Sequence, residues 1–185
     1  MIRKFVIAAL VATIALPGVA SAQSRDMPSA ERILRQLEAQ PRERVAPNRR
    51  VTVQEFKRRP EMRRAAPSIE IQSINFATGS AEIPYSQYRK VEQIGNALSR
   101  IVERNPRARF LVEGHTDAVG SGASNLALSE RRAESLKRLL VREFGVPFRA
   151  LETVGYGEDY LLVETPYESW ENRRVTLRRI DQFIR

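Results

Sequence analysis

The stretch EGHTDAVGS, from Glu113 to Ser121, places the only histidine of the chain two residues before an aspartate. A histidine beside an acid is the pair expected of a general base, and both residue types bind metals. A metal site of the usual kind needs three or four ligands, whereas the 185 residues include one histidine and no cysteine. The chain also lacks the Gly-x-Ser-x-Gly motif that presents a nucleophilic serine. We therefore expect His115 to be a loop or core histidine, with no catalytic residue, no metal and no cofactor.

The predicted helix at 125–144, which follows this loop, contains an arginine in its apolar stripe. The stripe is formed by Leu128, Leu136 and Leu139. Arg132 falls within it, and a buried charge without a partner costs several kcal/mol, so this arginine needs an anion. The candidate is Asp117, in the loop before the helix. Two interpretations are open: a closed ion pair that holds the loop, or an open pair that binds a ligand carrying an ammonium and a carboxylate.

The elements that must position these residues form one domain, expected at 68–185. Apolar alternation predicts strands, and helical spacing predicts helices, in the order strand 69–76, helix 91–102, strand 108–112, helix 125–144, strand 151–156 and strand 175–180. The alternation changes phase after Ile71, so the first strand is expected to carry a bulge or to end in a bend. Gly145 is expected to end the second helix as a left-handed cap. The order βαβαββ predicts an α/β fold of the α+β sandwich kind, in which helices pack on a small mixed sheet.

Residues 1–22 have the pattern of a secretory signal peptide. Arg3 and Lys4 precede an apolar stretch, and an Ala-Ser-Ala triplet ends at Ala22. An uncleaved membrane helix is the alternative, but the apolar run from Phe5 to Leu16 is shorter than the roughly 20 residues that a spanning helix needs. We expect an exported protein. Because it has no cysteine, it contains no disulfide and no site for a lipid on an N-terminal cysteine.

Residues 23–67 carry a net charge of +6, from twelve basic and six acidic residues, out of +9 for the whole chain. Five prolines and few large apolar residues predict a disordered linker, with one short helix near 29–39. Export excludes nucleic acid as the partner of this segment. It leaves outer-membrane proteins, anionic lipid head groups or anionic cell-surface polymers. A solvated spacer without a partner explains the same composition.

The two central motifs lie close together in the chain. The loop GHTDAVG is followed by NLALSERRAESL, so that Asp117 stands fifteen residues before Arg132. Three further segments accompany this pair: INFATGSAEI at 74–83 before it, and GVPFRALETVGYGE at 145–158 and NRRVTL at 172–177 after it. Together these motifs resemble the OmpA-like C-terminal domain family over about 110 residues. The family signature is a Thr-Asp-x-x-Gly loop and then Asn-x-x-Leu-Ser-x-x-Arg-Ala.

This resemblance implies a function as well as a fold. Members bind peptidoglycan without cutting it, through the diaminopimelate of the stem peptide. By resemblance, Asp117 binds the ammonium and Arg132 the carboxylate of that residue, with Asn125 and Thr116 assisting and Arg173 near the site. Opposite charges at a fixed separation suit a zwitterion, and a guanidinium meets a carboxylate through two hydrogen bonds.

The expected protein is therefore a non-enzymatic periplasmic tether between the outer membrane and the cell wall, with peptidoglycan as its partner. One alternative is a peptidoglycan-active enzyme or enzyme subunit that uses a pair of carboxylates. Another is a stator-like wall-binding protein held in the inner membrane by its first helix, although that helix has no acidic residue to move protons. Glu168 and Ser169 stand where the family usually has Gly-Arg, so an arginine contact from that loop is expected to be missing.

Overall fold

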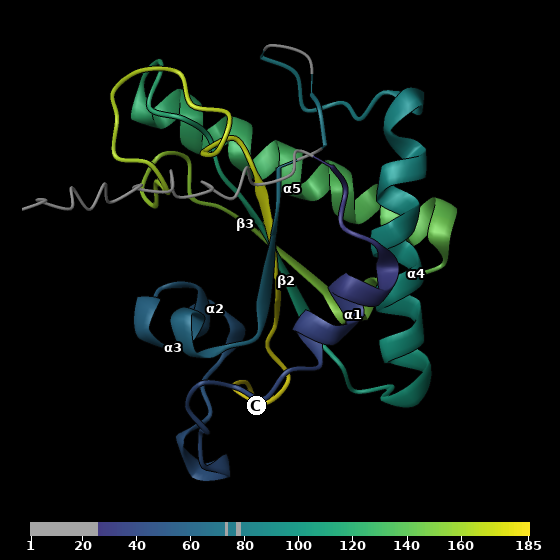
Figure 1. Ribbon diagram of the computed structural model, residues 1–185. Helices are drawn as coiled ribbons and strands as arrows, with labels where there is room; N and C mark the ends of the chain where they lie inside the picture. The colour runs from purple at the N-terminus through teal and green to yellow at the C-terminus, as the bar shows by residue number, and fades with distance from the viewer. Residues whose placement is uncertain (1–25, 73, 77–78) are drawn as a thin grey trace, which may run out of the picture.

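A mixed four-stranded sheet lies at the centre of the computed structural model, which describes residues 26–72, 74–76 and 79–185 (Figure 1). Its strands in chain order are β1 (Ser68–Ile71), β2 (Phe110–Gly114), β3 (Leu151–Gly155) and β4 (Val175–Arg179). Their order across the sheet is β1-β4-β2-β3. β4 is antiparallel to both neighbours, whereas β2 and β3 are parallel and need a helical crossover between them.

Helices cover both faces of this sheet. The α-helices of the described chain are α1 (Ala30–Leu37), α2 (Val53–Lys57), α3 (Pro60–Ala65), α4 (Tyr88–Arg104) and α5 (Gly122–Phe144), and the short 3-10 helices are η1 (Pro47–Arg49), η2 (Tyr85–Gln87) and η3 (Phe148–Ala150). α4 and α5 lie on one face, with α1 against α4, and α2 and α3 lie on the other (Figure 1). Phe110 and Val112 of β2 enter the first core and Leu111 enters the second, as the two-residue period of a strand requires.

The predicted order of strands and helices is confirmed. Gly145 ends α5 in the left-handed conformation, with φ of 66°, as its position in the sequence predicted. β1 ends at Ile71, the point after which the apolar alternation changes phase. Ile74 is buried in the main core.

α5 lies very close to the ends of β2 and β3 because glycines stand at the contact. A Cβ added to Gly114 would lie 2.2 Å from the carbonyl oxygen of Ser129, and one added to Gly155 would lie 2.4 Å from the backbone nitrogen of Glu130. Side chains there would push the helix off the sheet. The close approach therefore fixes the first half of α5, which carries Arg132, against the end of the sheet.

The described part of the segment predicted as a disordered linker, residues 26–67, is packed against the domain. The short helix expected within it is present as α1, whose Ile33 is fully buried in the main core. Phe56 of α2 is also fully buried, and its ring centroid lies 5.7 Å from that of Phe183. The prediction of disorder is wrong for these residues because their few large apolar side chains find partners far along the chain.

A buried ion-pair network also joins α3 to the sheet. Arg63 is 5% exposed and donates to Glu113 of β2 from Nε at 3.2 Å and from Nη2 at 3.1 Å. Arg178 of β4 donates to the same carboxylate at 2.8 and 3.2 Å. The Arg63 guanidinium also lies 3.8 Å from the ring centre of Tyr156 and 4.2 Å from that of Tyr160. Arg63, one of the basic residues that led to the prediction of a solvated linker, is therefore buried in the folded domain.

The described helices include none that is both long and apolar enough to cross a membrane. The predicted signal peptide, residues 1–22, lies outside the described residues.

Candidate functional site

The loop between β2 and α5 is anchored to the ends of the neighbouring strands. His115 N donates to the carbonyl of Arg174 at 3.0 Å, and Thr116 N donates to that of Gly157 at 2.9 Å. At its other end, the side chain of Ser121 caps the first turn of α5. The loop is thus held at both ends, as a preformed binding site requires.

Asp117 is buried in this loop, but it does not pair with Arg132. Its Oδ2 accepts a 2.6 Å hydrogen bond from Nη1 of Arg173, whose side chain is 42% exposed. The same Nη1 lies 3.9 Å from Glu168, so one of the residues that replace Gly-Arg adds a second acid beside this arginine. Oδ1 of Asp117 accepts only a 3.4 Å bond from the backbone of Val119. The closed Asp117–Arg132 ion pair is therefore not formed, and a different arginine contacts the acid.

Arg132 is 8% exposed and faces inward, as predicted. Its Nε donates to the carbonyl oxygen of Ser80 at 3.1 Å, and its guanidinium lies 4.8 Å from the ring centre of Phe76. Among the ion pairs of the described residues, none involves Arg132. Burial lowers the pKa of Arg132 and the charge of Arg173 lowers it further, while the charge of Asp117 acts in the opposite direction. An incoming anion would therefore stabilise this guanidinium.

Asn125, at the start of α5, holds the loop in place. It is 5% exposed, and its Nδ2 lies 2.5 Å from Oε2 of Glu158. The same nitrogen lies within hydrogen-bond distance of the backbone oxygens of Asp117 and Val119, at 3.3 and 3.2 Å. Asn125 therefore fixes the loop backbone at the acid and two residues after it, and ties it to Glu158 in the segment after β3.

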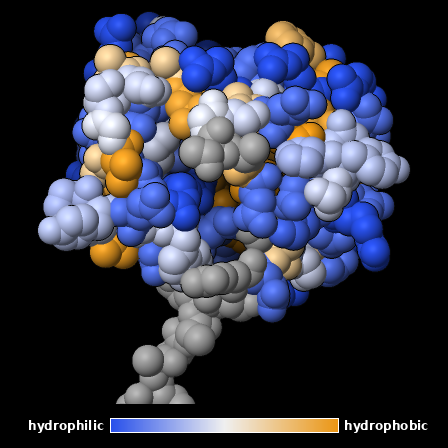
Figure 2. Space-filling view, turned by 90° about the horizontal axis from the view of Figure 1, so that it is seen from above, coloured by the Kyte–Doolittle hydropathy of each residue, from blue (hydrophilic) through white to orange (hydrophobic). Residues whose placement is uncertain are grey.

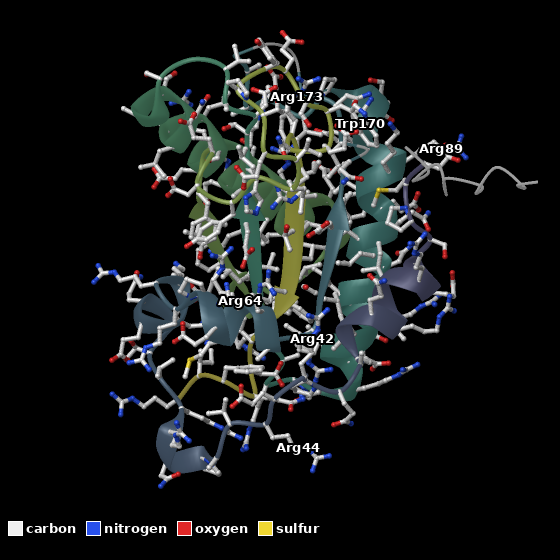
Figure 3. The ribbon with its side chains drawn as sticks, turned by 60° about the vertical axis from the view of Figure 1, so that its left-hand side comes forward. Arg42, Arg44, Arg64, Arg89, Trp170 and Arg173 are labelled. Carbon is white, nitrogen blue, oxygen red and sulfur yellow. The ribbon has the colours of Figure 1, made fainter. Side chains whose placement is uncertain are left out.

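A cleft of about 200 Å³ opens beside these residues. The side chains that give it its chemistry are Phe76, His115, Arg132, Trp170, Arg173 and Arg174. Its lining includes three arginines and no acidic residue, so the cleft is positively charged. Arg173 and Trp170 lie together at the end of the molecule where the loops gather (Figure 3). Seen from above that end, hydrophobic side chains show between hydrophilic ones (Figure 2).

Two buried side chains of the cleft have nitrogen atoms without a hydrogen-bond partner in the described structure. These are both ring nitrogens of His115, which is 2% exposed, and Nε of Arg174. Burial lowers the pKa of His115 to about 4, although Nε2 lies 3.8 Å from the carboxylate of Glu113. The ring is therefore neutral at pH 7. The prediction of a loop or core histidine is confirmed by this burial.

The five residues expected to bind ligand fall into two groups. Arg132 and Arg173 line the cleft, and Asp117 lies behind Arg173 through their ion pair. Asn125 and Thr116 are buried within the loop, where the first supports the backbone and the hydroxyl of the second has no partner among the described residues. The structure thus brings the three charged residues together at the cleft, whereas Asn125 and Thr116 are buried beside it.

Sequence reasoning missed part of the cleft. Phe76 and Arg174 belong to motifs that were recognised, but no local pattern shows which way their side chains point. Trp170 also lines the cleft, partly exposed. Glu158 ends a recognised motif, and its contact with Asn125 depends on the crossover of the fold. Among the described residues, no group of three or more acidic or histidine side chains could hold a metal ion.

Residues 75–174 match the OmpA family, and the chain belongs to that family. It is 35% identical over 85 residues to outer membrane porin F of Pseudomonas aeruginosa, a match that covers 46% of this chain and 23% of the porin. It is 44% identical over 73 residues to the peptidoglycan-associated lipoprotein of Pseudomonas putida, covering 38% of this chain and 43% of the lipoprotein. The matched region thus spans less than half the length of either relative.

Two solved structures are similar to this chain. The periplasmic domain of MotB from Helicobacter pylori is 21% identical with a TM-score of 0.50, over 60% of this chain and 74% of that one. The peptidoglycan-associated lipoprotein from Burkholderia pseudomallei is 27% identical with a TM-score of 0.49, over 65% of this chain and 95% of that one. The family match and the arrangement of its elements give the chain an OmpA-like α/β fold, in which helices pack on a mixed four-stranded sheet.

Proposed function

We propose that this protein binds peptidoglycan without cutting it, and that the cleft receives the diaminopimelate of the stem peptide. The observation that carries the proposal is the buried guanidinium of Arg132, which faces a cleft of about 200 Å³ and forms no ion pair with a described carboxylate. Membership of the OmpA family supports it, as does the likeness to proteins named peptidoglycan-associated lipoprotein. The chain is accordingly a binding protein and not an enzyme.

Arg132 is suited to the carboxylate of diaminopimelate. Because its Nε already donates to Ser80, the two terminal nitrogens are left for a bidentate contact with the ligand. The site is mostly desolvated, so a charged hydrogen bond formed there is stronger than one in water. Lysine at this position would keep the charge but lose the planar fork.

Asp117 is suited to the ammonium group. Its Oδ1 accepts only the long bond from Val119, so this oxygen is available to a donor from the ligand. Its Oδ2 is held by Arg173, which is partly exposed and lines the same cleft. In the proposed complex, Arg173 orients Asp117, and Asn125 holds the loop backbone beside it.

The affinity of one such site is modest. Each charged hydrogen bond contributes about 1.5 to 3 kcal/mol, and association costs remove part of the sum, which leaves micromolar to millimolar binding. Peptidoglycan repeats the same ligand many times, so rebinding retains the protein on the wall. In an exported protein, this binding fits a periplasmic tether between the wall and the outer membrane.

Sedimentation with purified peptidoglycan sacculi tests the proposal. We expect Arg132→Ala and Asp117→Asn each to abolish co-sedimentation while the thermal unfolding transition stays cooperative. Arg131→Ala is the matched control, because the neighbouring arginine is exposed. Retention of both site variants on sacculi would refute the assignment of the cleft. Sacculi that contain lysine in place of diaminopimelate should bind the wild type less, because lysine lacks the second carboxylate.

A further inference from the structure

A strongly basic surface lies on the segment that precedes the OmpA domain. Residues 42–64 include nine basic and three acidic residues, a net charge of +6. Six of the basic residues are exposed and form what we call the distal basic face: Arg42, Arg44, Arg49, Arg58, Arg59 and Arg64. One of the three acids, Glu55, is used locally, because its side chain accepts from the backbone of Thr52 at the start of α2.

The charges of the distal basic face are not neutralised by the described protein. None of its six arginines forms an ion pair with a described carboxylate, whereas Arg100 and Arg104 on α4 pair with Glu31 and Glu38 of α1. Such exposed charges in a flexible linker would be unremarkable. Here they lie in and between short helices of a segment that is docked on the domain through Arg63 and Phe56.

The distal basic face also contains a groove of about 150 Å³. Three arginines and two acids line it together with apolar side chains: Arg44, Arg49, Arg59, Glu43, Glu61, Val45, Met62, Ala65 and Phe183. The arginines outnumber the acids by one, so the lining keeps a net positive charge next to apolar side chains, which suits a phosphate attached to an apolar body. This chemistry differs from that of the wall-binding cleft, which lies elsewhere in the molecule. Arg44 lies toward the end of the molecule opposite Arg173 and Trp170, and Arg42 and Arg64 lie between these two ends (Figure 3).

We propose that the distal basic face docks on the surface of an anionic lipid bilayer, through the phosphates of its head groups. A bilayer presents many phosphates in one plane, which suits arginines spread over a rigid face. A bilayer is favoured over a wall polymer because, in a protein whose cleft holds the wall, the opposite end points away from the wall. The proposal rests in this respect on the proposed function. It makes the folded chain a bridge with two binding ends.

Vesicle flotation with the purified exported protein tests this proposal. We expect binding to vesicles of phosphatidylethanolamine and phosphatidylglycerol, little binding to vesicles of neutral phosphatidylcholine, and loss of binding as salt is raised. The variant Arg44→Ala/Arg64→Ala should bind about 25-fold more weakly, at about fivefold for each arginine. The control Arg89→Ala/Arg131→Ala removes the same charge from exposed positions outside the distal basic face and should bind like the wild type.

Three results would overturn the proposal. Failure of the wild type to bind anionic vesicles would do so, and so would equal losses in the two double variants, which would indicate a response to net charge alone. Stronger retention by a soluble polyphosphate than by vesicles would assign the face to an anionic polymer. Sedimentation of the same variants with sacculi separates the two proposals, because Arg44→Ala/Arg64→Ala should still bind the wall. Wall binding that fails while vesicle binding persists would remove the proposed function alone.

Discussion

Replacement of Arg63 by alanine tests whether the N-terminal segment is an integral part of the fold. The change removes two hydrogen bonds to Glu113, at 3.1 and 3.2 Å, and the contacts with two tyrosine rings. Breaking a buried ion pair from one side costs about 3 to 5 kcal/mol, because the other charge stays buried. Arg178 still donates twice to Glu113, so we expect the lower end, about 3 kcal/mol.

Urea denaturation measures the loss of unfolding free energy, and trypsin digestion shows which part of the chain becomes accessible to cleavage. The segment around α2 and α3 is rich in arginine, so its release in Arg63→Ala should accelerate tryptic cleavage there while the sheet stays protected. Arg64→Ala is the control: this neighbour is exposed, and its loss should change stability by less than about 0.5 kcal/mol. Equal stability and equal cleavage rates in the two variants would refute the reasoning.

Three further substitutions test other parts of the structure. Burial lowers the pKa of His115 to about 4, so as the pH falls the unfolded state takes up a proton at a higher pH than the folded state does. The free energy of unfolding should therefore fall by about 3 kcal/mol between pH of about 6.5 and 4. Urea titrations of His115→Asn should show a flatter dependence on pH. Gly114→Ala should destabilise the domain by about 2 kcal/mol or more, because its Cβ would meet the backbone of Ser129; Gly122→Ala, whose Cβ would meet nothing nearer than 3.6 Å, should be nearly neutral in thermal melts. Asn125→Ala should weaken sedimentation with sacculi and increase amide exchange in the loop, since three acceptors lose their donor; unchanged exchange would contradict its supporting role.

The sequence determined the main elements of the domain because their signals are local. Helical periodicity located α4 and α5, and Gly145 marked the end of α5. The order of strands and helices left few ways to build a small mixed sheet, and the motifs around Asp117 and Arg132 pointed to one family. The inward direction of Arg132 was also readable, because a helix fixes the faces of its residues.

The tertiary structure decided the partners of these charges. The ion pair of Asp117 with Arg173 joins residues 56 positions apart, and the distance between such residues is set by the crossing of strands and not by local spacing. Trp170 and Phe76 became cleft residues for the same reason.

The N-terminal segment marks the largest difference between sequence and structure. Composition predicted a disordered linker, since a segment with few apolar residues cannot bury enough surface by itself. The segment is ordered because it packs on the rest of the chain. Phe56 packs against Phe183, and Arg63 donates to Glu113. The sequence by itself fixed what each residue can do, whereas long-range packing decided which residues meet, because burial energy depends on surfaces that only the folded chain brings together.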